Sequence, residues 1–338
     1  MTGAEELGIC MERLAMVIVT YKRQELLERL FASILKLTEA PWRIVVVDNE
    51  NSERTSGIVK QFGQECTELW GTTEPDEEGG TARVVYFPQT ENIGGSGGFS
   101  RGVGKAYALG ASWFWVMDDD VSVLSDAVTA LGKWSKRFGA IQGQRYDADG
   151  GHFFWQYRFN TALAIYNPFS PSGWKPGEEY KECNALCFEG GCFSREVVSK
   201  IGLPDERFFI YLDDALYGYL ASKVTTVALV PDYVVKRERE VQNQSIGSVR
   251  QLNSTSDMTR YYITRNRGYL ARYFQLYGDY SPVGYALGTL LNFAKELIRL
   301  GLVDRGHFSS SWARLWAGYK DSKTILHDKD WKPMPPLA

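Results

Sequence analysis

The chain has 338 residues, of which 44% are hydrophobic and 23% are charged, values typical of a globular protein with one large domain or two modest ones. Its net charge of −3 provides no basic field, so we expect no nucleic-acid partner. The five cysteines include no CxxC pair, which argues against a zinc site or a disulfide framework and favours a reducing compartment.

The N-terminal segment, residues 1–13, is a polar and acidic tail without the charged-then-apolar pattern of an export signal. The sequence also has no run of about 18 apolar residues that would span a membrane. We therefore expect a cytoplasmic protein.

Residues 14–145 alternate between strand-like and helix-like patterns. Four apolar runs are typical of buried parallel strands: 14–20, 43–47, 84–87 and 113–117. Three segments between them have helical spacing or composition: 24–37, 54–63 and 98–110. This alternation predicts an α/β fold with a mostly parallel central sheet, whose ligands lie beyond the carboxyl ends of the strands.

The pattern is less regular after residue 145. We expect a loop-and-hairpin insert at 146–180, a helix at 193–202, a strand at 208–212 leading into a helix at 215–223, and a strand at 224–230. From residue 258 the chain is mostly helical, with a break at Pro282. We divide the chain into a donor-binding half (14–145), an acceptor-binding and catalytic half (146–257) and a helical C-terminal region (258–338).

Three consecutive carboxylates, Asp118, Asp119 and Asp120, directly follow the strand at 113–117. Adjacent carboxylates repel one another, and a divalent cation that also binds substrate phosphates would offset that repulsion. Oxygen ligands of this kind favour Mg²⁺ or Mn²⁺. The alternative is a solvated acidic turn that caps the next helix.

A glycine-dense segment, 92–98 (NIGGSGG), lies between a strand and a helix. Such a loop lets the backbone approach a phosphate at a helix N-terminus, although the segment is neither a GxGxxG motif nor a P-loop. A flexible turn is the alternative. Asp48 ends a strand, where it would either bind a base or ribose or cap a helix.

A second acidic pair, Asp213 and Asp214, follows the apolar segment 208–212. A carboxylate near the same cleft would suit a general base that takes a proton from an acceptor hydroxyl. The alternative is favourable charge at the N-terminus of the following helix.

These motifs occur in an order that resembles glycosyltransferase family 2: VIVTYKR, VVVDN, ENIGGSGGFSRG, FWVMDDD, GLPDERFFIYLDD and YYITRNRGYL. The GGSGGFSR segment in particular resembles the actinobacterial galactofuranosyltransferases. The resemblance covers residues 14–270 and implies a GT-A, Rossmann-like nucleotide-sugar-binding fold with a helical C-terminal appendage.

The resemblance also implies roles for individual residues. Thr20 and Arg23 would lie at the nucleotide, Asp48 would face the uracil, and Asn92, Gly94 and Gly95 would contact the ribose or diphosphate. Asp118 and Asp120 would hold Mn²⁺ or Mg²⁺ with Asp119 beside them at the donor, and Asp214 would be the base, oriented by Asp213. Gly190 and Gly191 resemble the acceptor-side loop, and composition alone makes Trp155 and Trp174 candidate sugar platforms.

One feature departs from the family. Relatives often have a metal-binding histidine shortly after the strand at 224–230, and this chain has none there. Either Glu238 or water replaces it, or the metal is held more weakly.

The implied reaction is inverting transfer of galactofuranose from UDP-galactofuranose to a saccharide or lipid-linked saccharide, for cell-wall or surface polysaccharide, at the cytoplasmic face of the membrane. Residues 282–317 would suit peripheral membrane contact or an ordinary buried helix. Two alternatives stay open: a rhamnosyltransferase that uses dTDP-rhamnose, and a catalytically silent carbohydrate-binding protein. A nucleotidyltransferase is disfavoured because no glycine follows the first strand.

Overall fold

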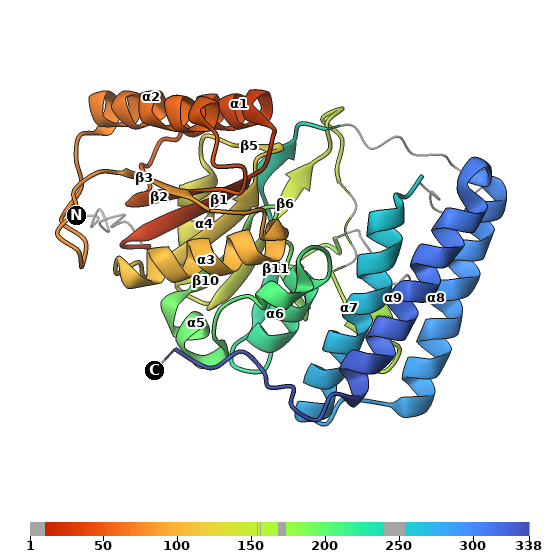
Figure 1. Ribbon diagram of the computed structural model, residues 1–338. Helices are drawn as coiled ribbons and strands as arrows, with labels where there is room; N and C mark the ends of the chain where they lie inside the picture. The colour runs from red at the N-terminus through yellow and green to blue at the C-terminus, as the bar shows by residue number, and fades with distance from the viewer. Residues whose placement is uncertain (1–10, 154, 156, 168–173, 240–253, 338) are drawn as a thin grey trace.

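The computed structural model describes residues 11–153, 155, 157–167, 174–239 and 254–337. Its centre is a nine-stranded sheet in the order β3-β2-β1-β4-β10-β6-β11-β5, with β9 also paired to β11 (Figure 1). The strands are β1 (Leu14–Thr20), β2 (Arg43–Asp48), β3 (Val84–Pro88), β4 (Trp113–Asp118), β5 (Val121–Val123), β6 (Ala140–Tyr146), β9 (Lys181–Cys183), β10 (Gly191–Ser194) and β11 (Val227–Arg237).

Most strands of this sheet run in the same direction. β1 pairs in parallel with β2 and β4, β2 with β3, and β6 with β11. Because β10 is antiparallel to both β4 and β6, those two strands share one direction. The predicted mostly parallel sheet is confirmed, with β5, β9 and β10 running the other way.

Helices cover both faces of the sheet (Figure 1). β1 alternates between two cores: Ala15, Val17 and Val19 face one core, and Met16 and Ile18 face the other. The first core includes side chains of α3 (Gly94–Ala108), α5 (Arg195–Ile201) and α6 (Asp213–Ala221). The second includes side chains of α1 (Gln24–Ile34), α2 (Glu53–Trp70) and α4 (Ala127–Ser135).

Three long helices form a bundle beside the sheet (Figure 1): α7 (Asp257–Leu276), α8 (Pro282–Leu302) and α9 (Phe308–His327). Pro282 begins α8, because a proline is tolerated in the first helical turn, and Ser281 caps the helix. The expected break at this residue is confirmed.

The segment 208–212 is not the strand that the apolar pattern predicts. It continues from a short 3-10 helix (η1, Glu206–Phe208) into bends, and three of its residues have positive φ: Phe209 (63°), Tyr211 (69°) and Leu212 (68°). Such backbone is rare for bulky residues and persists only where the surroundings impose it. The predicted hairpin within 146–180 consists of β7 (Phe159–Asn160) and β8 (Ile165–Tyr166).

Candidate active site

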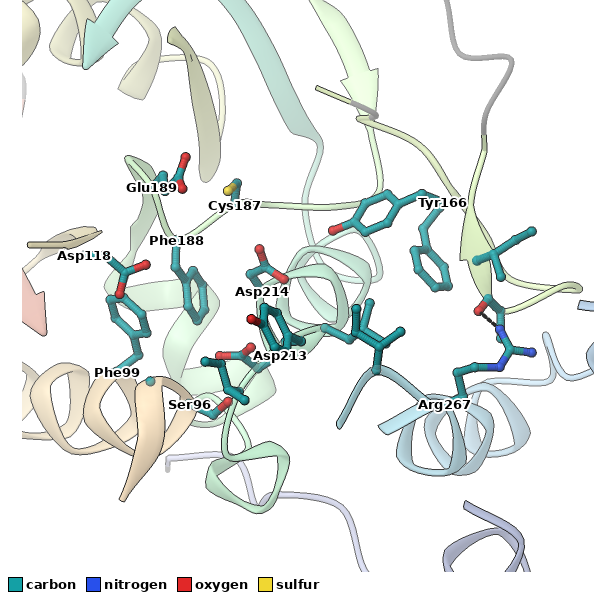
Figure 2. Close-up of a pocket in the computed structure, with 18 of the residues that line it drawn as sticks. Ser96, Phe99, Asp118, Tyr166, Cys187, Phe188, Glu189, Asp213, Asp214 and Arg267 are labelled. Carbon is teal, nitrogen blue, oxygen red and sulfur yellow. Dashed lines mark hydrogen bonds between the residues drawn. The ribbon is translucent and has the colours of Figure 1, made fainter. Parts of the chain in front are cut away.

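A cavity of about 840 Å³ lies between the sheet, the β7–β8 hairpin and the helices α7 and α8. Both acidic clusters line it: Asp118 and Asp120 from the end of β4, and Asp213 and Asp214 from the start of α6. Figure 2 shows Asp118 on one side and Tyr166 on the other, with Asp214 between them. Two pairs of carboxylates therefore share one cleft, whereas Asp48, Asn92 and Asp119, which also follow strands and were expected there, do not line it.

The three consecutive aspartates have different surroundings. Asp119 is buried and accepts hydrogen bonds from the Thr20 hydroxyl (2.7 Å) and from Nη1 of Arg23 (3.1 Å). The same Arg23 nitrogen donates to Asp120 at 3.1 Å. Both carboxylate oxygens of Asp119 therefore accept hydrogen bonds from other side chains of the protein, whereas Asp118 and Asp120 line the cavity.

Asp118 suits a cation. Burial raises the pKa of its carboxyl well above the usual range, and the nearby charges of Asp120, Asp119 and Glu189 raise it further. Among the described residues, no side chain donates a hydrogen bond to it. A partly buried carboxylate that lines the cavity and has no donor among the described residues fits a divalent ion, which would be held by Asp118 and Asp120.

The described residues include no group of three or more His, Cys, Asp or Glu side chains arranged to hold a metal. Further ligands would therefore come from phosphate oxygens and water. Glu238 does not line the cavity: its carboxylate accepts a hydrogen bond from Ser122 and lies 3.8 Å from Arg29. The neighbouring Arg237 lines the cavity instead.

The second acidic pair begins α6. The Asp214 carboxylate accepts a hydrogen bond from the backbone N–H of Ala215 (2.7 Å). Burial raises the pKa of Asp213 to about 6. Burial, and then the charge of Asp213, raise the pKa of Asp214 to about 7. A carboxylate with a pKa near neutrality is well suited to general-base work.

Two residues of α7, Arg265 and Asn266, hold the backbone that precedes this pair, and no role for either was predicted from the sequence. The Asn266 amide donates to the carbonyls of Phe208, Ile210 and Tyr211 at 2.8–3.1 Å. Arg265 donates to the carbonyls of Arg207 and Phe208. These bonds explain how three positive-φ residues persist next to the catalytic candidates. Both residues lie in the segment YYITRNRGYL, but nothing in the sequence between this segment and the acidic pair indicates that the two are in contact.

The glycine-dense segment is the first turn of α3, so the expected loop with a helix from residue 98 is wrong in its boundary. Asn92 accepts a hydrogen bond from the N–H of Gly94 (3.0 Å), which turns the chain into the helix. Gly94 has φ 73°, and a Cβ there would lie 2.1 Å from the Phe209 carbonyl oxygen. A Cβ on Gly95, which lines the cavity, would meet open space.

Five expected donor residues lie outside the cavity lining: Thr20, Asp48, Asn92, Gly94 and Asp119. Thr20 is buried against Asp119. Asp48 is buried and accepts hydrogen bonds from the N–H groups of Glu50 (2.8 Å) and Ser52 (3.2 Å) and from the Tyr86 hydroxyl (2.7 Å). In the structure Asp48 therefore holds the turn between β2 and α2, whose N-cap is Ser52, and its contact with uracil stays a prediction.

The acceptor-side candidates also lie outside the lining. Gly190 (φ 97°) and Gly191 form the turn into β10, and they shape the segment that brings Glu189 to the cavity. Trp155 and Trp174 are partly buried against the first core. Their roles as sugar platforms stay predictions without support from this geometry.

Glu189 is a cavity residue to which the sequence analysis gave no role of its own. Its carboxylate lies 2.7 Å from Nη1 of buried Arg145 and 3.3 Å from Nε of Arg237. Its negative charge contributes to the raised pKa values of Asp118, Asp120 and Asp214. Glu189 and the two arginines therefore connect the two acidic clusters electrostatically.

The fold is similar to that of TarS from S. aureus in complex with UDP-GlcNAc, with a TM-score of 0.55, 12% identity and coverage of 93% of this chain and 81% of that chain. It is also similar to the mannosyltransferase PcManGT from Pyrobaculum calidifontis in complex with GDP-Man and Mn²⁺, with a TM-score of 0.53, 13% identity and coverage of 94% and 88%. These likenesses confirm the predicted GT-A fold.

Sequence comparison gives the family. The chain is 26% identical over 270 residues to the galactofuranosyltransferase GlfT1 of Mycolicibacterium smegmatis, which covers 75% of this chain and 81% of that protein. It is 26% identical over 203 residues to GlfT1 of Mycobacterium tuberculosis, covering 59% and 60%. Residues 15–202, more than half of the chain, match Glycosyl transferase family 2. The chain therefore belongs to glycosyltransferase family 2.

Proposed function

We propose that this protein transfers galactofuranose from UDP-galactofuranose to a hydroxyl of a saccharide acceptor, with inversion at the anomeric carbon. The observation that carries the proposal is the single cavity that joins a cation-suited carboxylate pair to a second pair with near-neutral pKa values. The similarity to proteins named galactofuranosyltransferases supports the choice of sugar. The UDP-GlcNAc complex of TarS supports a uridine nucleotide.

The donor lies against the end of β4 and the start of α3. Asp118 and Asp120 would hold Mn²⁺ or Mg²⁺, which when bound offsets the charge that grows on the departing diphosphate. Asp119, fixed by Thr20 and Arg23, keeps the acidic turn in place. The N-terminus of α3 at Gly95 favours the negative charge of the diphosphate.

The acceptor lies on the Asp214 side of the cavity. Asp214 takes the proton from the acceptor hydroxyl as its oxygen attacks the anomeric carbon from the face opposite the diphosphate, in a single displacement. The charge of Asp213 makes Asp214 more basic, and the positive charge of Arg145 limits that effect. We place this reaction at the cytoplasmic face of the membrane, on a saccharide or lipid-linked saccharide of a cell-wall or surface polysaccharide.

A panel of nucleotide sugars tests this proposal. UDP-galactofuranose, dTDP-rhamnose and GDP-mannose would each be incubated with the protein and Mn²⁺, with and without EDTA, and release of the nucleotide followed. We expect release from UDP-galactofuranose that EDTA suppresses. Preferred turnover of dTDP-rhamnose would make the protein a rhamnosyltransferase. Binding without any turnover would make it a carbohydrate-binding protein.

A further inference from the structure

The helix α8 buries two polar side chains, Asn292 and Glu296, and exposes most of its aliphatic ones. Its five buried positions are Tyr285, Gly288, Asn292, Glu296 and Leu300. Its exposed large side chains are almost all aliphatic: Val283, Leu287, Leu290, Leu291, Leu297, Ile298 and Leu302. A helix on the surface of a protein in water normally has the reverse arrangement, so something apolar should cover the outer side of α8.

The contacts of the inner side fix this orientation. The buried Glu296 carboxylate forms ion pairs with Arg260 of α7 (3.1 Å) and with Arg299. A Cβ on Gly288 would lie 1.9 Å from the carbonyl oxygen of Leu163 in the β7–β8 hairpin, so the two backbones are in close contact. Rotation of α8 to bury its leucines would break these interactions. Glu296 would lose its ion pair with Arg260, although Arg299, on the same helix, would move with it.

The exposed aliphatic side of α8 continues onto α9. Phe293 of α8 makes edge contacts with Trp312 and Trp316, which stack on each other and are both exposed. Together, the exposed aliphatic residues of α8 and the two tryptophans of α9 form what we call the α8–α9 apolar face. Tryptophan at the edge of an aliphatic surface is typical of a protein that lies at a membrane–water boundary.

The charge and position of this face favour a lipid bilayer as its partner. The one charged side chain among the exposed positions of α8, a helix described along its whole length, is the basic Lys295, which is half exposed although its Nζ lies 3.9 Å from the Glu296 carboxylate. No helix in the described part of the chain could cross a membrane. An interfacial helix with an aliphatic side and a basic residue suits the plane of an anionic membrane.

The same face adjoins the active site. Leu291, which is 45% exposed, lines the catalytic cavity together with its neighbours Asn292 and Lys295. A bilayer in contact with this face would therefore lie at the edge of the cavity.

We propose that the α8–α9 apolar face lies in the interfacial layer of an anionic bilayer, with Leu291 at the point where this face meets the cavity. This inference does not depend on the proposed transferase function.

Vesicle co-sedimentation of the full chain tests this proposal. The probe is vesicles of phosphatidylethanolamine with phosphatidylglycerol, compared with phosphatidylcholine alone. We expect the unmodified protein to bind, more tightly to the anionic vesicles, and the double variant Leu287→Glu/Leu290→Glu to bind at least tenfold more weakly. Leu290 is 65% exposed, so the substitution should not disturb folding. The matched control is Leu69→Glu, a 54% exposed leucine on α2, which should bind like the unmodified protein.

Three results would overturn the bilayer proposal: no binding by the unmodified protein, equal loss in the Leu69→Glu control, or a dimer in solution that the double variant converts to monomers without vesicle binding. The last result would assign the face to a second copy of the chain. UDP release from UDP-galactofuranose in buffer, without vesicles, separates this proposal from the proposed function. We expect the double variant to retain that release, and absence of release from both proteins would contradict the transferase and leave the vesicle result to stand alone.

Discussion

The two acidic clusters of the cavity contain the same residue type in different settings. Asp118, Asp119 and Asp120 lie at a strand end, where Arg23 contacts two of them and Asp118 has no donor among the described residues. Asp213 and Asp214 begin a helix, where burial raises their pKa values to about 6 and about 7. The first setting favours a bound cation, and the second favours a base that exchanges protons near neutral pH. Environment rather than residue identity thus separates the two roles.

The largest effect is expected at the strand-end cluster. Asp118→Asn removes the charge of the carboxylate that has no donor, so we expect transfer to fall by at least ~10³-fold, the upper range for loss of one electrostatic group. Initial rates with Mn²⁺ and UDP-galactofuranose measure it. Asp126→Asn, an exposed aspartate just beyond the cluster, is the control and should retain its rate. If Asp118→Asn keeps most of its activity, the cluster is an acidic turn.

The helix-start cluster should respond less strongly. Asp214→Asn preserves side-chain shape and removes basicity, so we expect a loss of at least ~10²-fold in transfer rate. Asp213→Asn should be milder, because Asp213 acts on its neighbour through its charge. The same rate assay compares the two variants. If Asp213→Asn is the inactive one, the roles are reversed, and if both are active, the base lies elsewhere.

Gly95→Val probes the space that we assign to the diphosphate. The valine side chain would enter the cavity where a Cβ now meets open space. We expect UDP affinity to fall about tenfold, which corresponds to roughly 1.4 kcal/mol. Calorimetry measures it, with Gly57→Val on α2 as the control, since a Cβ there also meets open space. Unchanged UDP binding would show that the diphosphate does not approach Gly95.

Asn266→Ala tests how far the helix-start cluster depends on support from α7. The variant leaves the carbonyls of Ile210 and Tyr211 without their donor, while the Phe208 carbonyl keeps its bond from Arg265, so we expect a loss of about 2–3 kcal/mol in the free energy of unfolding. The transfer rate should fall several-fold, because the segment that Asn266 holds leads directly to the proposed base, Asp214. The affinity for UDP should not change, because UDP binds at the other cluster. Denaturant unfolding and initial rates report the two effects. A variant with parental stability and rate would contradict the proposed support.

The pH dependence gives the smallest effect. A base with a pKa near 7 makes kcat/KM fall as the pH drops below that value. In Asp213→Asn the charge that raises the pKa of Asp214 is gone, so the acidic limb of the profile should move to lower pH. If the acidic limb of the profile does not move, it reports the ionisation of a group other than Asp214.

The sequence predicted the strand-end cluster better than the helix-start cluster, for a physical reason. The buried runs of β1, β2 and β4 are local patterns, and parallel strands bring their ends together wherever they occur. The backbone of 208–212 depends instead on Asn266, more than fifty residues away, and no local pattern encodes positive φ at Phe209 or Leu212. Glycine is also a poor helix former, so composition misplaced the start of α3.

The most direct test of the division between the clusters is UDP binding by calorimetry, with and without Mn²⁺, in the unmodified protein, Asp118→Asn and Asp214→Asn. We expect Mn²⁺ to strengthen UDP binding in the unmodified protein and in Asp214→Asn, and to have no effect in Asp118→Asn. A metal effect that survives in Asp118→Asn and disappears in Asp214→Asn would contradict the assignment of the donor to one cluster and the base to the other.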